Sequence, residues 1–315
     1  MALLQVQHIS KIIEGNIIVD DISFEQKPLQ KLAIAGASGS GKTTLLKMIA
    51  GHVQPTAGTI LFEGEKVTGP DEKLLPGHTQ IAYLSQHYEL LNNYRVEELI
   101  WFENKLTESE AAQLFEICKI YHLLKRRTDR LSGGEKQRIA LCMLLVKKPK
   151  MLVLDEPFSN LDPMHTDILK TVLDDITERL KITCALASHD PDDTLPWADQ
   201  ILAIKDGQLL QLGTPQKLYH EPVNEYVAGL FGKYNLLKPH IASMFGIASN
   251  GNDIMTRPEH FKISTTEAGV NGTITKINFR GGFYEAEVMV EGARIIVKHD
   301  RNQCSVGDKI FISIK

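Results

Sequence analysis

The chain has 315 residues, of which 43% are hydrophobic and 23% are charged, and its formal net charge is −4. This length indicates two domains, and the composition is ordinary for a globular protein. The acidic balance argues against a general nucleic-acid binder, which is usually basic. The four cysteines lie far apart and form no CxxC pair, which predicts reduced thiols in a reducing compartment and no zinc site.

The sequence contains no pattern typical of a membrane span or a secretion signal. Its longest apolar run, IALCMLLV at 139–146, is far shorter than the roughly 20 residues that cross a bilayer. The N-terminus, MALLQVQHIS, lacks a basic region followed by an apolar core. We therefore expect an intracellular protein, and any work at a membrane would require partner subunits.

The first 235 residues alternate between strand patterns and helix patterns. Short antiparallel strands are expected over 1–30, and residues 92–148 are predicted to be largely helical. Buried strands are predicted at KLAIAG (31–36), MLVLDEP (151–157) and ITCALASHD (182–190), and short strands and turns over 55–85 end at the strand in QIAYLS (80–85). Strands that alternate with helices predict an α/β fold with a mainly parallel sheet covered by helices on both faces.

The pattern changes near residue 236. From there to Lys315 short strands alternate apolar and polar residues, as in Tyr284–Val290, and glycines such as Gly281-Gly282 separate them. This pattern predicts a small all-β barrel of about five strands. We expect domains at 1–235 and 236–315, with a helical subdomain at about 90–148 inside the first.

The segment GASGSGKT at 36–43 has the form GxxxxGK[ST], lying between a predicted strand and a helix. Its glycines let the backbone wrap around phosphate, and the positive end of the helix favours the anion. Lys42 supplies a cation near the β- and γ-phosphates, and Thr43 offers a hydroxyl to Mg²⁺. The alternative is a plain glycine-rich turn. The predicted ATP-binding residues of this loop are Gly36, Ala37, Ser38, Gly39, Ser40, Gly41, Lys42, Thr43 and Thr44.

Further polar residues follow the other predicted strands of the parallel sheet. Asp155 suits Mg²⁺, which takes one or two carboxylates, and Glu156 could act as general base for a water molecule. His189 follows the next strand, at the end where α/β sheets bind ligands, and Gln86 could reach the metal or the water through its carbonyl oxygen. The alternatives are a structural acid pair, a structural histidine and an ordinary surface glutamine.

The segment LSGGEKQRIA at 131–140 is a second anion-binding pattern. Ser132 can cap a helix whose first backbone N–H groups, at Gly133 and Gly134, face an anion. A helix cap alone explains Ser132, but it does not explain two glycines where they cost stability.

These motifs, in this order, resemble the ATP-binding subunit of an ABC transporter over about residues 1–235. GASGSGKT is similar to the Walker A motif, MLVLDEP to Walker B, LSGGE to the ABC signature and Gln86 to the Q-loop. SNLD (159–162) is similar to the D-loop, ending at Asp162, and His189 to the switch histidine. The resemblance implies a P-loop NTPase with a RecA-like core and with antiparallel β and helical subdomains.

The resemblance also implies cofactors and partners. ATP with Mg²⁺, held by Thr43, Gln86 and Asp155, would lie between two head-to-tail copies of the chain. Ser132, Gly133, Gly134 and Glu135 of one copy would contact the nucleotide of the other. Two integral-membrane permease subunits and, indirectly, a solute-binding protein are the other expected partners, at the cytoplasmic face of the membrane, with no nucleic acid. Ile13 occupies the position where the family usually stacks an aromatic ring on adenine, and Glu135 stands where glutamine is more frequent.

The C-terminal part resembles the TOBE-type regulatory domain of importer ATPases for sugars, polyamines, sulfate and ferric iron. The similar segments are 206–232, TRPEHF at 256–261 and 269–288. The compact domain is most similar to those of the iron(III) or polyamine branches, which makes these the expected solutes. The alternatives are the ATPase subunit of an exporter and a soluble ABC ATPase that acts on nucleic acid or ribosomes. The β domain argues against the first, and the single cassette with a short helical region argues against the second.

Overall fold

The computed structural model describes residues 2–86, 89–264, 269–300 and 304–315. The chain forms two compact units, one ending at Pro215 and the other spanning Gln216–Lys315. The boundary expected at 235/236 lies inside the second of these units.

A six-stranded sheet carries the larger unit. All its neighbouring strands are parallel except the last pair, β9 and β10, which form an antiparallel hairpin turning at Asp206-Gly207. The middle strands are buried on both faces, which explains their continuous apolar sequences. The strand order of the six-stranded sheet is β10 (Gln208–Gly213), β9 (Gln200–Lys205), β3 (Leu32–Ala35), β8 (Thr183–Ser188), β7 (Met151–Asp155) and β6 (Ile81–Leu84).

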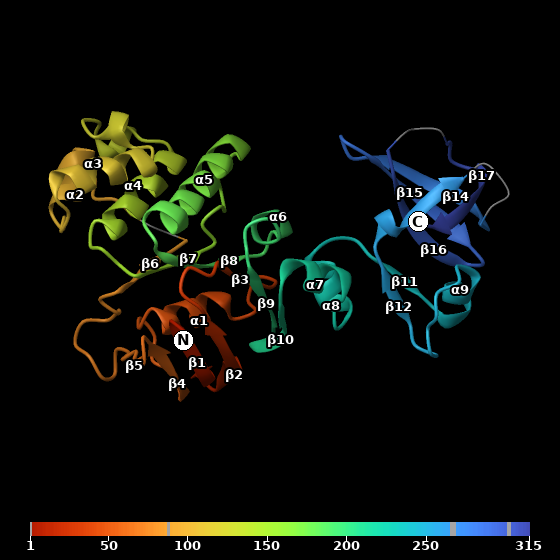
Figure 1. The fold of residues 1–315 in the computed structure, drawn as a ribbon, viewed down its shortest axis with the longest axis horizontal. Helices are drawn as coiled ribbons and strands as arrows, with labels where there is room; N and C mark the ends of the chain where they lie inside the picture. Colours follow the sequence, from red (N-terminus) through yellow and green to blue (C-terminus); the bar gives the residue numbers. More distant parts are fainter. Residues whose placement is uncertain (1, 87–88, 265–268, 301–303) are drawn as a thin grey trace. The chain divides into compact units, whose positions relative to one another are not determined.

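A second, antiparallel sheet belongs to the same unit, and helix α1 (Lys42–Ile49) packs between the two sheets (Figure 1). This confirms the antiparallel strands expected over the first thirty residues. Leu45, Leu46 and Ile49 of α1 are buried in the core that the two sheets share. The order of this sheet is β2 (Asn16–Gln26), β1 (Leu4–Ile13), β4 (Ala57–Phe62) and β5 (Glu65–Lys66).

Helices cover the opposite side of the six-stranded sheet (Figure 1). The segment expected to be largely helical forms α2 (Val96–Trp101), α3 (Glu108–Ile117) and α4 (Gly133–Leu145). Between α3 and α4 the chain makes only two 3₁₀ turns, Tyr121–Leu123 and Thr128–Arg130. The strands β7 and β8 are joined by α5 (Pro163–Arg179), and α6 (Pro191–Thr194) follows β8.

The smaller unit contains the predicted all-β region. Five antiparallel strands pair in the order β13, β17, β14, β15 and β16, and a short β11–β12 pair precedes them. Inward-facing residues such as Ile274, Val288 and Ile312 form its core. Its elements are α7 (Pro215–His220), α8 (Glu225–Leu230), β11 (Asn235–Leu237), α9 (Pro239–Met244), β12 (Ile254–Thr256), a 3₁₀ turn (Pro258–His260), β13 (Phe261–Ser264), β14 (Val270–Phe279), β15 (Tyr284–Val290), β16 (Ala293–His299) and β17 (Lys309–Ile314).

Arg257 explains why residues 216–235 belong to the smaller unit. Its buried guanidinium donates through Nη1 to the carbonyl oxygens of Ala228, Gly232 and Lys233, at 3.0, 3.1 and 3.1 Å. Its Nε donates to the Tyr219 carbonyl oxygen at 2.9 Å, and the group lies over the Tyr219 ring, 4.1 Å from the centroid. One side chain from TRPEHF therefore binds backbone carbonyl groups near the ends of α7 and α8 and in the two residues Gly232 and Lys233 that follow α8.

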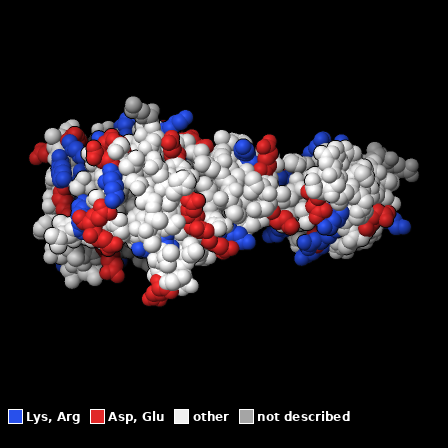
Figure 2. Space-filling view, turned by 90° about the horizontal axis from the view of Figure 1, so that it is seen from below, with Lys and Arg blue, Asp and Glu red and all other residues white. Residues whose placement is uncertain are grey.

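The surface of the larger unit is mixed in charge. Figure 2 shows acidic and basic side chains interspersed among uncharged areas on the face that it presents. Within the described ranges, no helix combines the length and the apolar character needed to cross a membrane.

Candidate nucleotide-binding site

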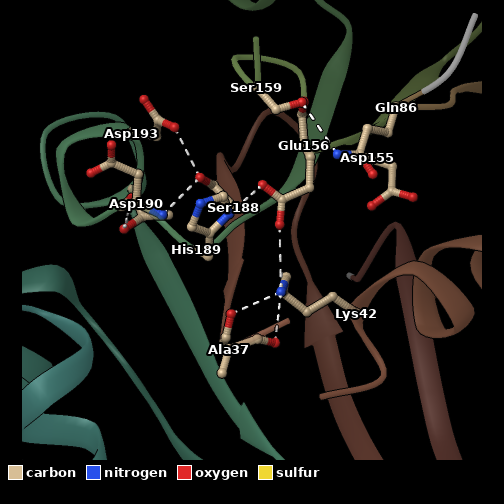
Figure 3. A network of polar contacts seen from close by, with 12 residues as sticks. Ala37, Lys42, Gln86, Asp155, Glu156, Ser159, Ser188, His189, Asp190 and Asp193 are labelled. Carbon is tan, nitrogen blue, oxygen red and sulfur yellow. Dashed lines mark hydrogen bonds and ion pairs between the residues drawn. The ribbon is translucent and has the colours of Figure 1, made fainter. Parts of the chain in front are cut away.

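Four neighbouring parallel strands end at one edge of the six-stranded sheet, and each is followed by a predicted motif. In sheet order β3 leads into the glycine-rich loop, β8 into His189, β7 into Glu156 and β6 into Gln86. Carboxyl ends of neighbouring parallel strands meet at the same edge, so segments far apart in the sequence form one site (Figure 3).

The glycine-rich loop needs its glycines for two different reasons. At Gly36, a Cβ atom would lie 2.5 Å from the Ile204 carbonyl oxygen, so the loop has no room for a side chain there. Gly39 and Gly41 have φ of 81° and 99°, a left-handed conformation that other residues rarely adopt. A Cβ at Gly41 would also approach the Ile18 carbonyl oxygen to 2.6 Å. The loop is thus fixed by β2 and β9 around an exposed tip at Ala37–Gly39.

Lys42, the first residue of α1, points back into this loop. Its Nζ donates to the carbonyl oxygens of Gly36 at 2.8 Å and Ala37 at 3.1 Å. Glu156 Oε1 lies 3.5 Å from the same nitrogen, and both side chains are almost fully buried. The ammonium therefore stands at the positive end of α1, where a phosphate group is favoured. Thr44 follows in the first turn of α1, half-buried.

Asp155 and Thr43 form the part of the site that suits Mg²⁺. The Thr43 hydroxyl donates to Asp155 Oδ1 at 3.0 Å, and the Tyr83 hydroxyl donates to Oδ2 at 3.0 Å. Burial, and then the charge of Asp155, raise the pKa of Tyr83, so its hydroxyl stays protonated and holds the carboxylate. Across the described residues no three His, Cys, Asp or Glu side chains form a metal cage. One carboxylate and one hydroxyl fit an ion that keeps waters and binds substrate phosphates.

Glu156 lies between Lys42 and His189 (Figure 3). Its Oε2 accepts a hydrogen bond from His189 Nδ1 at 2.8 Å, while its Oε1 faces Lys42. Its backbone is left-handed, with φ of 49°, and its N–H donates to the Ala187 carbonyl oxygen at 3.0 Å. A left-handed backbone at a non-glycine residue costs of order 1 kcal/mol or more. Such a conformation persists only where the surrounding structure fixes it, which is often at a functional site.

The turn after β8 positions His189. The Ser188 hydroxyl donates to Asp193 Oδ2 at 2.9 Å and accepts from the Asp190 N–H at 3.1 Å. Asp193 in turn lies 3.1 Å from Lys170 Nζ of α5. Burial raises the pKa of Asp193, against the opposing effects of Ser188 and Lys170. These contacts hold the turn that carries His189, whose side chain is 57% exposed.

Gln86 is exposed at the end of β6 and contacts the turn after Glu156. Its amide Nε2 lies 3.5 Å from the Ser159 hydroxyl, which donates to the Glu156 carbonyl oxygen at 2.8 Å. The amide nitrogen of Gln86 thus faces the loop after Glu156. The metal contact predicted above would instead use the side-chain carbonyl oxygen of Gln86. A metal or water contact of Gln86 stays a prediction.

The segment LSGGE begins α4 with a capping box. Ser132 Oγ accepts from the Glu135 N–H at 3.3 Å, and Glu135 Oε2 accepts from the Ser132 N–H at 2.8 Å. Glu135 Oε1 also pairs with Arg126 Nη1 at 2.9 Å, and Arg126 Nη2 donates to the Arg130 carbonyl oxygen. Although burial opposes it, the pKa of Glu135 is lowered by the Ser132 backbone and by Arg126. The charge of Glu135 thus holds the start of α4 to the preceding turn.

Asp162 caps the next helix. Its Oδ1 accepts from the His165 N–H at 3.0 Å, and its Oδ2 lies 2.6 Å from His165 Nδ1. Ile13 ends β1 opposite Asn16, and its side chain is 44% exposed. Ile12 and Ile17, which pair with each other in the same hairpin, are exposed as well.

Three residues of the site escaped sequence reasoning. Tyr83 lies in QIAYLS, where a hydroxyl near the end of a buried strand was a usable signal. Arg126 and His165 had none, because their partners Glu135 and Gly134 are recognised only once the helices are placed. All three act on residues that the sequence did identify.

Comparison with known proteins decides the family. A family model described as "ABC transporter" matches residues 19–159, and one described as "TOBE domain" matches 254–315. The chain is 32% identical to the "Spermidine/putrescine import ATP-binding protein PotA" of Clostridium acetobutylicum, over 99% of this chain and 94% of that protein. The chain belongs to the ABC transporter family. A second relative of this ABC subunit, "Fe(3+) ions import ATP-binding protein FbpC 2" of Rhodococcus jostii, is 32% identical over 88% of this chain and 85% of its own.

Solved structures agree with this assignment of the ABC fold. The structure of cbiO1 from Clostridium perfringens, described as part of the ABC transporter complex cbiONQ, has a TM-score of 0.62 and 27% identity. It covers 69% of this chain and 90% of its own. The ADP conformation of MJ1267, an ATP-binding cassette at 24% identity, shows the fold alone, with a TM-score of 0.62. The predicted P-loop fold, TOBE domain and family are confirmed. The chain is an ABC transport ATPase that energises import, and the exporter and soluble alternatives are not favoured.

Proposed function

We propose that two copies of this chain bind two molecules of ATP between them, head to tail, and hydrolyse them to drive two permease subunits. The observation that carries this proposal is the second anion-binding helix terminus. The P-loop and α1 already supply a full phosphate site, whereas Ser132 and Gly133 are exposed at the start of α4. A twofold dimer gives these groups a ligand, namely the nucleotide of the partner.

Thr43 and Asp155 are the residues that would hold Mg²⁺, with Gln86 as a third candidate. The ion supplies positive charge that neutralises the phosphates. Tyr83 keeps the Asp155 carboxylate oriented, and the Thr43 hydroxyl faces the same carboxylate, so the donor set is arranged before nucleotide binds.

Glu156 acts as the general base in this proposal. It takes a proton from a water whose oxygen attacks the γ-phosphorus, while the bond to the β–γ bridging oxygen breaks and ADP leaves. His189 contacts the γ-phosphate and keeps the water in line, and Lys42 stabilises charge on the β- and γ-phosphates. Ile13 packs against adenine with aliphatic instead of aromatic contact. Asp162 links the two sites across the dimer.

The partners are assigned by the same reasoning. The helical segment exposes Trp101, Phe102 and Tyr121, large apolar groups that suit contact with a membrane subunit. The subunit would lie peripherally at the cytoplasmic face of the membrane, and a solute-binding protein would act indirectly. The named relatives import spermidine and putrescine or Fe(3+) ions. We therefore propose a polyamine or iron(III) as solute, and transport assays of the assembled complex with each would distinguish them.

Replacing Gly133 with Asp tests the shared site. A Cβ at Gly133 meets nothing within 4 Å in its own chain, so the folded monomer tolerates the change. A carboxylate there would repel the partner's phosphates. We expect MgATP binding by the monomer to be unchanged, and ATP-dependent dimerisation, measured by light scattering, and hydrolysis to be lost. Loss of monomer binding would show that the signature serves its own nucleotide, and normal hydrolysis would show that it serves none.

A further inference from the structure

The beginnings of α4 and α5 meet through one side chain, that of His165. Gly134, the second residue of α4, is buried, and a Cβ atom there would lie 2.5 Å from Cδ2 and 2.8 Å from Cγ of the His165 ring. At the adjacent Gly133, a Cβ would meet nothing within 4 Å. The imidazole ring of His165 therefore occupies the space that a side chain would need at Gly134, whereas the same space at Gly133 is open.

Asp162 holds the opposite part of the same ring. Its Oδ2 lies 2.6 Å from His165 Nδ1, and because a carboxylate only accepts, Nδ1 carries the proton. The His165 backbone N–H donates to Asp162 Oδ1, and this bond first, then the ring, lower the pKa of the Asp162 carboxyl. The ring is thus fixed by a charged hydrogen bond on one side and by the backbone of α4 on the other.

We propose that His165 is a positioning residue that couples the D-loop to the signature, so that Asp162 and the start of α4 keep one fixed geometry. This inference rests on the proposed function, in which both segments act on the partner's nucleotide. His165 does not itself contact the nucleotide. Backbone N–H groups stabilise a phosphate only within hydrogen-bond distance, so a shift of about 1 Å at α4 lowers the rate strongly.

A double-mutant cycle tests this coupling in the full chain. Gly134→Ala should lower kcat about tenfold, because the methyl group displaces either the ring or α4. It should leave MgATP affinity of the monomer unchanged, since the P-loop sets that affinity. In the His165→Ala background, the same Gly134→Ala change should cost less than about twofold, because the ring is gone. His165→Ala alone should lower kcat, and His165→Asn, which keeps an amide N–H for Asp162, should recover part of it.

Gly133→Ala provides the matched control, since its cycle with His165→Ala should be additive. Equal costs of Gly134→Ala in both backgrounds would overturn the coupling. If the Gly134→Ala monomer no longer binds MgATP, the coupling is tested instead by comparing kcat of His165→Ala with kcat of His165→Asn. A wild-type kcat in both variants would overturn the coupling. Failure of the proposed function looks different, because Gly133→Asp would then hydrolyse ATP normally whatever residue occupies position 165.

Discussion

Replacing Glu156 with Gln keeps the size of the side chain and removes its charge. Loss of a general base costs about 10²–10⁴-fold in rate, which is roughly 3–5 kcal/mol of barrier. The same change releases Lys42, whose Nζ lies 3.5 Å from Glu156 Oε1. At that separation the attraction is roughly 5 kcal/mol at an effective dielectric constant near 20, before the large offset from desolvation. We therefore expect MgATP affinity to be retained or increased while kcat falls.

Two measurements on the same protein check this prediction. Equilibrium binding of MgATP to the monomer reports the release of Lys42, and single-turnover hydrolysis reports the chemical step. The variant should also accumulate as an ATP-bound dimer by light scattering. Turnover within about tenfold of wild type would refute the base assignment. Weaker binding with normal single-turnover chemistry would show instead that Glu156 serves only to orient Lys42.

Three further changes follow from contacts described above. Glu135→Gln should keep an oxygen for the cap of α4 but lose the ion pair with Arg126. We expect at most about 1 kcal/mol of lost stability in urea unfolding, and kcat within about tenfold of wild type. Arg257→Ala should remove four hydrogen bonds to backbone carbonyl groups and destabilise the segment by about 1–3 kcal/mol in total. Hydrogen exchange should then accelerate over residues 215–235, while ATP binding persists. Gly41→Ala combines a φ of 99° with a 2.6 Å approach to the Ile18 carbonyl oxygen, so nucleotide affinity should fall at least about tenfold in a fluorescence titration. Unchanged affinity would show that the loop adapts.

The sequence predicted the elements of the site because each is a local pattern. A buried strand followed by GASGSGKT or by Asp155-Glu156 specifies its own turn, and the parallel sheet then brings the carboxyl ends together. The order of the four strands in the sheet was not readable locally, since pairing is set by long-range packing. The structure divides into its two units about twenty residues before the expected domain boundary. Local patterns could not show this, because the Arg257 side chain holds a segment that precedes it by up to 38 residues.

Side-chain partners across helices were equally hidden. The sequence showed that two glycines at the start of α4 are costly but not why both are present. The structure gives Gly134 a steric reason in His165, whereas Gly133 remains open towards the outside of the chain. Likewise the charge of Glu135 has a partner only because Arg126 returns to the start of α4 after two 3₁₀ turns.

The surroundings of Lys42 have a consequence for the order of events. An ammonium has three N–H donors, and here the Gly36 and Ala37 carbonyls and the Glu156 carboxylate surround it. An arriving phosphate must displace one of them, and Glu156 is the most distant. Under the proposed function, the substrate phosphate and Glu156 would therefore compete for the Lys42 ammonium. In the proposed mechanism, a phosphate that pairs with Lys42 would free the Glu156 carboxylate to accept a proton from water, so nucleotide binding itself would prepare the base for the reaction.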